Sequence, residues 1–231
     1  MIKLPRVSYC IFTYNQEAYI GDAVRAALAQ SYSNLEIIIS DDGSADQTVH
    51  IVEKIVSTYE GPHTVRTNFN EVNMGLGAHV SYVFAHLARG AYLITVGGDD
   101  YSFPSHVEMA VAEVSRNVDV SVIDFSADII NAEGALVGES LASAQGRRFR
   151  MQDFVDSLRR PPSFAPGRIL AREVFDHFGP IASECPTEDS VLVFRGLLLL
   201  GLYRSPEKVI CYRKHDGGLS RGNTMRNYNY E

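Results

Sequence analysis

The sequence has few cysteines, a deficit of basic residues and no long apolar run, and each shortage argues against a class of protein. Its three cysteines, Cys10, Cys185 and Cys211, are odd in number, far apart and without CxxC spacing. Neither a disulfide framework nor a cysteine zinc site is therefore expected. A reducing cytosol fits this cysteine usage best, so the expected location is cytoplasmic.

Acidic residues outnumber basic residues, with 28 Asp and Glu and 21 Lys and Arg. The net charge of −7 argues against nucleic acid as a partner, since a surface that tracks phosphates usually makes a domain basic. The longest apolar stretch, residues 196–202, is far shorter than the roughly 20 residues that span a bilayer. The first residues break at Pro5 before any apolar run, which does not resemble a signal peptide.

Strand and helix patterns alternate along the first hundred residues. The short apolar runs typical of strands buried on both faces are residues 7–13, 35–40, 64–68 and 91–96. The segments with apolar side chains at helical spacing are residues 17–30, 46–59 and 77–88. This alternation predicts an α/β fold with a mainly parallel central sheet covered by helices.

The pattern changes after residues 118–125, the next apolar strand. Residues 128–137 predict a hairpin that turns at 131–134, which would be a small antiparallel addition to the sheet. A helix is expected over 191–202 and a last strand over 208–211. We expect one domain over residues 1–220, followed by a polar tail, 221–231, interpreted as the possible start of a truncated region.

Polar residues follow three of the predicted strands, where ligands bind in open parallel sheets. They are Thr13-Tyr14-Asn15, Asp41-Asp42-Gly43-Ser44 and Gly97-Gly98-Asp99-Asp100. The second group has two interpretations. It is either a turn with Asp46 as the N-cap of the next helix, or a nucleotide contact in which one carboxylate accepts the imide N–H of uracil or thymine.

Asp99 and Asp100 are adjacent carboxylates, which are costly to hold together unless a cation neutralises them. Mg²⁺ and Mn²⁺ prefer oxygen ligands and commonly bridge carboxylates to a diphosphate. The pair therefore predicts a divalent metal site that stabilises a diphosphate leaving group. An exposed acidic turn is the alternative.

Two later groups carry weaker signals. Glu188 and Asp189 precede a predicted helix, where a carboxylate caps the N-terminus or acts as a general base. His215 follows the last predicted strand in a basic loop. It is either a solvated loop histidine or, if the fold brings it beside Asp99 and Asp100, a metal ligand or diphosphate contact.

Arginines cluster in the second half of the chain, against only Asp153 and Asp156 over the same span. They are Arg147, Arg148, Arg150, Arg159, Arg160, Arg168 and Arg172. A solvated surface is one interpretation. The other is a docking face for phosphate or anionic lipid, which would allow peripheral contact with a membrane.

Five segments in order resemble the GT-A family 2 glycosyltransferases of the bacterial surface-polysaccharide type. They are VSYCIFTYNQEAYIGDAVRAALAQSYSNLEIIISDDGSADQT, NMGLG, VGGDDYSFP, TEDSVL and YRKHDGGLS, within residues 7–220. The resemblance implies an inverting transfer of a sugar from a nucleoside-diphosphate sugar, with a UDP-sugar favoured. The implied acceptor is a hydroxyl of a saccharide or lipid-linked saccharide, and the implied cofactor is Mn²⁺ or Mg²⁺.

The resemblance also assigns roles to residues. The donor site it implies consists of Thr13, Tyr14, Asn15, Glu17, Asp41, Asp42, Ser44, Asn73, Gly75 and Asp99. Asp41 would face the uracil, and Asp99 would approach the ribose or the sugar. Asp99 or Asp100 would hold the metal, with His215 as a further candidate ligand. Asp189 would be the base, with Glu188 beside it. Gly97 departs from the family, where many members have an aspartate.

Three other functions are alternatives to this one. A sugar-1-phosphate nucleotidyltransferase should have a glycine-rich loop after the first strand, where this chain has Thr13 to Glu17 without glycine. A Rossmann dehydrogenase lacks support for the same reason, since no GxGxxG is present there. A catalytically inactive sugar-nucleotide-binding relative is the non-enzymatic rival, and the presence of Asp99, Asp100 and Asp189 together argues against it.

Overall fold

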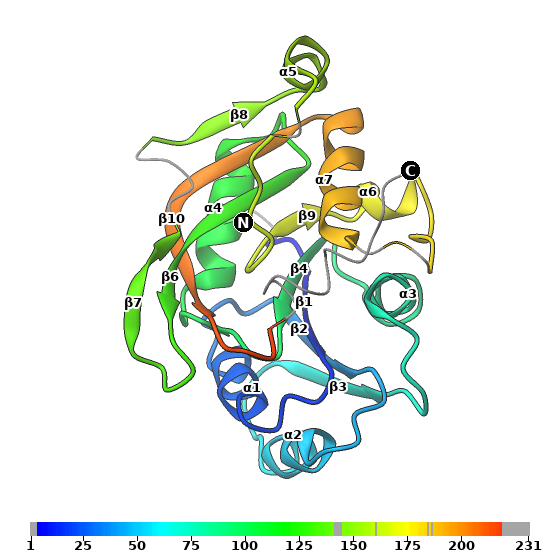
Figure 1. The fold of residues 1–231 in the computed structure, drawn as a ribbon, viewed down its shortest axis with the longest axis vertical. Helices are drawn as coiled ribbons and strands as arrows, with labels where there is room; N and C mark the ends of the chain where they lie inside the picture. The colour runs from blue at the N-terminus through cyan, green and yellow to red at the C-terminus, as the bar shows by residue number, and fades with distance from the viewer. Residues whose placement is uncertain (1–3, 141–144, 160, 184, 186, 219–231) are drawn as a thin grey trace.

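The computed structural model describes residues 4–140, 145–159, 161–183, 185 and 187–218 (Figure 1). The strands are β1 (Val7–Thr13), β2 (Leu35–Asp41), β3 (Thr64–Phe69), β4 (Tyr92–Gly97), β5 (Tyr101–Ser102), β6 (Val122–Ile130), β7 (Leu136–Ser140), β8 (Arg147–Phe149), β9 (Ile169–Ala171) and β10 (Leu202–Arg213). The helices are α1 (Ile20–Leu28), α2 (Thr48–Val56), α3 (Leu76–Tyr82), α4 (His106–Arg116), α5 (Met151–Ser157), α6 (Glu173–Asp176) and α7 (Glu188–Leu199). The α/β class expected from the sequence is confirmed.

The first half of the chain forms the parallel part of the sheet. β1 pairs in parallel with β2 and β4, and β2 pairs in parallel with β3. The predicted helix over 77–88 is α3, which continues as a π-helical segment, Val83–Leu87. Thr13 is paired with Asp41, and Phe12 with Gly97, so the carboxyl ends of β1, β2 and β4 lie at one edge.

The second half of the chain makes the sheet mixed. β9 lies between β4 and β6 and is antiparallel to both, whereas β6 and β10 are parallel. The predicted hairpin is confirmed, since β6 and β7 pair in antiparallel fashion. The prediction that the last helix reaches residue 202 was wrong. α7 ends at Leu199, and Gly201 takes a positive φ of 135°, which glycine tolerates and which ends the helix before β10.

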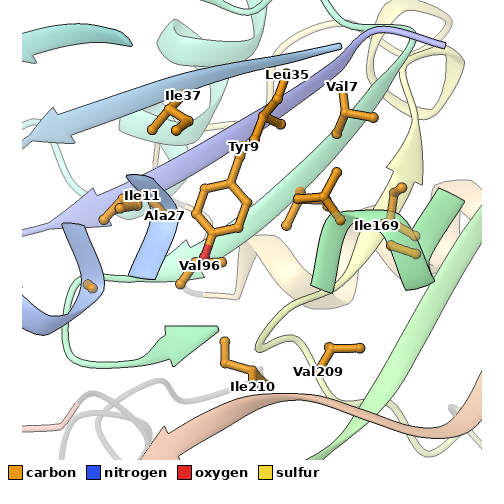
Figure 2. Packing of buried hydrophobic residues seen from close by; sticks show 14 of the residues in the cluster. Val7, Tyr9, Ile11, Ala27, Leu35, Ile37, Val96, Ile169, Val209 and Ile210 are labelled. Atoms are coloured by element: carbon orange, nitrogen blue, oxygen red, sulfur yellow. The ribbon is translucent and has the colours of Figure 1, made fainter. Parts of the chain in front are cut away.

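Two apolar cores cover the two faces of the sheet. Alternate residues of β1 point to opposite faces, with Tyr9 and Ile11 in one core and Cys10 and Phe12 in the other. Figure 2 shows Tyr9 and Ile11 beside Ala27 of α1. α1, α2 and α4 cover this first core, and α3, α6 and α7 cover the second. No helix in the described part of the chain is long and apolar enough to cross a membrane.

The arginine cluster does not form one solvated face. Arg168 is buried, with 1% of its surface exposed, and forms an ion pair with buried Asp124. Arg172 donates to the Gly90 carbonyl, and Arg150 forms an ion pair with Asp119. The remaining described arginines, Arg147, Arg148 and Arg159, are exposed on β8 and beside α5, an arm at the top of Figure 1. Arg160 lies outside the described residues.

Candidate active site

The loop after β1 is bonded to the loop after β2 at the carboxyl edge of the sheet. Asn15 donates its backbone N–H to Ser44 Oγ at 2.7 Å and accepts the Ala45 N–H through its side-chain oxygen at 2.8 Å. Glu17 accepts the Gln47 N–H at 2.9 Å. Asn15 has a φ of 50°, a conformation that asparagine tolerates better than most residues. These bonds fix one wall of the site, beside which Tyr14 stays exposed.

Asp41 and Asp42 are both buried and face different partners. Asp41 accepts the Ser44 N–H at 2.8 Å and also the Ser44 hydroxyl. Asp42 accepts the Met74 N–H at 3.1 Å and the Gly75 N–H at 3.0 Å, which fixes the loop before α3. The predicted donor residues Asn73 and Gly75 are thus brought to the loop after β2. Asp42 acts as a support for this loop.

Two enclosed polar atoms next to Gly98 find no hydrogen-bond partner among the described residues. They are Thr13 Oγ1 and Gln16 Oε1. A Cβ atom at Gly98 would lie 2.7 Å from the first and 2.4 Å from the second, so only glycine fits here. Buried polar atoms are almost always bonded, so these two are candidates for contact with a ligand or water.

The acidic pair after β4 consists of two carboxylates in unlike environments. Asp100 is buried and accepts the Arg213 N–H through Oδ1 at 2.8 Å. Its burial and the neighbouring Asp99 charge raise the pKa of Asp100 well above its usual range, although Arg213 opposes the shift. Asp99 is less buried, and its Oδ2 lies 2.9 Å from His215 Nε2. The structure therefore brings Asp99, Asp100 and His215 together, which is the condition under which His215 is a candidate metal ligand.

Arg213 holds this part of the site in place. Its guanidinium donates to the Asp99 carbonyl at 3.0 Å, to the Ala132 carbonyl at 2.9 Å and to Asp22 of α1 at 3.1 Å. It also lies over the Tyr19 ring, 4.8 Å from the centroid, a favourable cation–π geometry. The acidic pair, α1 and the β6–β7 hairpin are thus joined through one side chain.

Gly97, the last residue of β4, lies against the same pair. A Cβ atom at this position would lie 2.6 Å from Asp99 Oδ1. An aspartate at Gly97 would therefore require the Asp99 carboxylate to move away from its present position.

Glu188 and Asp189 are the first two residues of α7. Burial and the neighbouring Asp189 charge raise the pKa of Glu188 to about 7, against backbone N–H groups and Arg168 that favour the carboxylate. Asp189 Oδ1 accepts the Ser190 N–H at 2.7 Å, and its carbonyl accepts from Arg168 Nη1 at 3.0 Å. The hydrogen bond from the Ser190 N–H and the hydrogen bond from Arg168 therefore fix the orientation of this turn.

The buried Arg168–Asp124 ion pair connects that turn to two strands and a loop. Asp124 of β6 accepts from Arg168 Nε at 2.6 Å and from the Phe164 N–H at 2.6 Å. Arg168 directly precedes β9 and its carbonyl accepts the Thr95 N–H of β4. The start of α7 is thereby fixed to strands near the carboxyl edge of β4.

No hydrogen bond or ion pair joins Glu188 or Asp189 to the acidic pair within the part of the chain that the structure describes. The loop before α7 lies instead against α3. A Cβ atom at Gly77 would lie 3.2 Å from the Ala182 carbonyl and 3.3 Å from the Cys185 carbonyl. The two carboxylates of α7 thus flank the site from the α3 side, and the metal-ligand candidates lie on the α1 side.

A divalent ion fits the described residues only with help from a ligand. Among them, no group of three or more His, Cys, Asp and Glu side chains is arranged to hold a metal ion. Of the three candidate ligands, Asp99 and His215 are the two whose side chains are in direct contact. Mg²⁺ and Mn²⁺ commonly take one or two protein carboxylates and complete their coordination with phosphate oxygens and water. The pair is compatible with such an ion once a diphosphate is bound.

Residues 8–179 match the model of the family described as Glycosyl transferase family 2. The chain belongs to this glycosyltransferase family. Among similar proteins, the chondroitin synthase of Escherichia coli is 31% identical over 136 residues, which are 58% of this chain and 19% of that protein.

Solved structures similar to this family 2 chain share its fold. S. aureus TarS 1–349 in complex with UDP-GlcNAc has a TM-score of 0.72 at 19% identity, covering 94% of this chain and 61% of that one. The mannosyltransferase PcManGT from Pyrobaculum calidifontis, with GDP-Man and Mn²⁺, has a TM-score of 0.69 at 16% identity, covering 94% and 59%. The GT-A fold is confirmed, and the chain spans less than two thirds of each relative's length.

Sequence reasoning missed four residues of this family 2 site. Gln16 and Arg213 lie inside two of the segments that resemble the family, but the resemblance gives neither of them a role. Arg168 was grouped with a surface cluster, although it is buried, and Asp124 was only part of an apolar strand pattern. A charged residue inside an apolar run is the signal that could have found the last one.

Proposed function

We propose that this family 2 glycosyltransferase transfers a sugar from a nucleoside-diphosphate sugar, most favourably a UDP-sugar, to a hydroxyl of a saccharide or lipid-linked saccharide. The observation that carries the proposal is the contact of His215 with Asp99, at 2.9 Å, beside the loops that follow β1 and β2. A carboxylate and an imidazole are thereby held at the edge where sheets of this class bind ligands.

The donor is proposed to lie across the carboxyl ends of β1, β2 and β4. Asp41 keeps a second lone pair on each oxygen after bonding Ser44, so it can still accept the imide N–H of uracil. The unpartnered Thr13 Oγ1 and Gln16 Oε1 are available to other polar atoms of the nucleotide. The remaining contacts are proposed at Tyr14, Asn15, Glu17, Asn73 and Gly75.

Asp99 and His215 are proposed as the ligands of Mn²⁺ or Mg²⁺. When bound, such an ion would offset the charge that develops on the diphosphate leaving group. Asp100 is less suited than Asp99 to direct ligation, because it is buried and its Oδ1 accepts the Arg213 N–H. Its role is proposed as a support that orients β10 and the acidic turn.

Asp189 is proposed as the general base of an inverting transfer. The acceptor hydroxyl would lose its proton to this carboxylate as its oxygen attacks the anomeric carbon from the face opposite the nucleoside diphosphate. Asp189 is the better supported of the two acids because Arg168 fixes its backbone. Glu188, with a pKa of about 7, is proposed to shape the acceptor side of the pocket.

The cellular setting is also a proposal. Assembly of a bacterial surface polysaccharide or lipid-linked oligosaccharide fits the family, and one relative is a chondroitin synthase. Peripheral contact at the inner face of a membrane would use the exposed Arg147, Arg148 and Arg159 together with Leu158, which is 81% exposed.

The function is tested by turnover of nucleotide sugars. Purified protein is incubated with UDP-, GDP- and TDP-sugars, with Mn²⁺ or with EDTA, and release of the nucleoside diphosphate is measured. We expect release from a UDP-sugar with Mn²⁺ that falls strongly in Asp99→Asn and not in the exposed control Asp156→Asn. Donor binding without any release or transfer would favour the inactive relative instead.

A further inference from the structure

Arg204 of β10 is a buried arginine with no bonded partner. Only 9% of its surface is exposed, and its Nε is enclosed without a hydrogen bond. Across the described residues its guanidinium takes part in no hydrogen bond or ion pair. The Nε–H is thus a buried donor without a partner, and leaving such a donor unpaired is costly.

The carboxylate nearest in the sheet is already engaged. Arg204 is paired in register with Asp124 of β6, but Asp124 accepts from Arg168 Nε at 2.6 Å and from the Phe164 N–H at 2.6 Å. Burial lowers the pKa of Arg204, and the Asp124 charge opposes that shift without bonding to the guanidinium. No hydrogen bond therefore forms between the Arg204 guanidinium and Asp124 among the described residues.

The opposite neighbour of Arg204 is a second arginine. In the antiparallel pair of β10 with β8, Arg204 lies directly across from Arg147. Like charges placed opposite each other in a sheet are destabilising. Arg147 is exposed and lies over the Phe149 ring, 4.7 Å from its centroid. No ion pair joins it to a carboxylate among the described residues. A bound anion would relieve both arginines.

This position lies on the same face of the sheet as the proposed base. Leu202, two residues before Arg204, and Val122, two before Asp124, both belong to the core that α7 covers. Arg168, which is bonded to Asp124, donates to the carbonyl of Asp189 at the start of α7. Arg204 is therefore the register neighbour of Asp124, whose ion pair with Arg168 leads to the backbone of the proposed base.

We propose that Arg204 binds an oxyanion, a carboxylate or a phosphate, carried by the acceptor, which makes the acceptor an anionic saccharide. Arginine suits this role because its planar fork can bind either group through two parallel N–H bonds. The oxyanion would fix the acceptor chain on the α7 face and present its hydroxyl to Asp189. This inference rests on the proposed transferase function.

The test observes the Arg204 Nε–Hε signal by ¹H–¹⁵N NMR, identified by its loss in Arg204→Lys. Protein containing UDP and Mg²⁺, which occupy the donor site, is titrated with D-glucuronate, with inorganic phosphate and with neutral D-glucose. We expect a saturable shift with glucuronate, phosphate or both, and none with glucose. A response to only one anion identifies which oxyanion the acceptor carries.

The variants give the control. In calorimetric titrations, Arg204→Gln should weaken binding of the responding anion by about 10- to 100-fold relative to wild type, as expected for loss of hydrogen bonds to a charged group. The exposed control Arg159→Gln should not change it. If Arg204→Gln does not fold, Arg204→Lys keeps the charge without the fork and should still weaken binding.

The inference is overturned if neither anion shifts the Arg204 signal, or if wild type and Arg204→Gln bind the anions equally. UDP binding is measured separately by calorimetry. Normal UDP binding without an anion response would remove this inference alone. Absent UDP binding would remove the proposed function, whereas the Arg204 titration would still report on the anion.

Discussion

His215 Nε2 lies 2.9 Å from Asp99 Oδ2, although 116 residues separate the two in the chain. The imidazole also packs against the Tyr19 ring, with centroids 4.6 Å apart. β10 brings the histidine there, because its last residue, Arg213, donates its backbone N–H to Asp100 Oδ1 and its Nε–H to the Asp99 carbonyl. The segment that contains His215 thus lies at the same edge of the sheet as the candidate residues that follow β1, β2 and β4.

Asp189→Asn should lower turnover by about 10²- to 10⁴-fold with little change in donor affinity, since the amide keeps the shape but cannot take a proton. Glu188→Gln should reduce turnover much less. Initial rates and calorimetric donor titrations on both variants check this. A larger rate loss in Glu188→Gln would assign the base to Glu188, whose pKa near 7 also suits a base.

Glu188 should make stability depend on pH. Its folded pKa of about 7 exceeds the usual value of 4.5, so the folded state holds the proton more tightly than the unfolded state. Stability from this group is therefore present below pH 4.5, is lost as pH rises towards 7, and stays lost above it. Glu188→Gln should stabilise the protein at pH 8 relative to wild type, by on the order of 3 kcal/mol, and much less at pH 4.5.

Urea unfolding of wild type and Glu188→Gln at several pH values measures this difference. Glu53→Gln, an exposed change on α2, is the control and should give a nearly constant difference across the range. A difference for Glu188→Gln that does not grow between pH 4.5 and 7 would contradict the burial of this carboxyl.

Arg168→Met should destabilise the fold by about 3–5 kcal/mol, because it leaves the buried Asp124 charge without its partner. The double change Arg168→Met with Asp124→Leu should recover most of that loss, since no buried charge remains. Denaturant midpoints check both, with exposed Arg159→Met as control. Equal losses in the single and double variants would show that packing, and not charge, sets the effect.

Asp41→Ala should erode a preference for uridine or thymidine diphosphate over cytidine or guanosine diphosphate, by roughly 1.5–3 kcal/mol. Asp41 also accepts two bonds from Ser44, so Ser44→Ala is the matched control for damage to the loop. Calorimetry with the four nucleotides separates the two effects. Tightest binding of guanosine diphosphate by wild type would contradict the assignment to Asp41.

The parallel half of the fold could be predicted from the sequence because each element there carries its own periodicity. β1 matches the predicted strand over 7–13, and β2 begins at the predicted residue. Ligand-facing loops follow from the same pattern, since parallel strands end at one edge. Asp46 was predicted as the cap of α2, and its carboxylate does accept the Thr48 N–H, although the helix begins two residues later.

Contacts between distant segments could not be predicted in this way. β9 has three residues, too few for a periodic signal, yet it separates β4 from β6. Arg168 and Arg159 look alike in sequence, and only the register of β9 against β6 places one of them beside Asp124. The roles of Arg213 and Arg204 likewise depend on which strands flank β10.

The most direct test of the central claim is a calorimetric titration of UDP in Mn²⁺ and in EDTA, on wild type, Asp99→Asn, His215→Ala and the exposed control His50→Ala. We predict binding by wild type and His50→Ala only with Mn²⁺, and weak binding by the other two variants. At a UDP concentration of 100 times the dissociation constant, wild type should be stabilised by about 2.7 kcal/mol. Equal UDP affinity in Mn²⁺ and EDTA, or unchanged affinity in Asp99→Asn and His215→Ala, would contradict a metal-assisted donor site at this edge of the sheet.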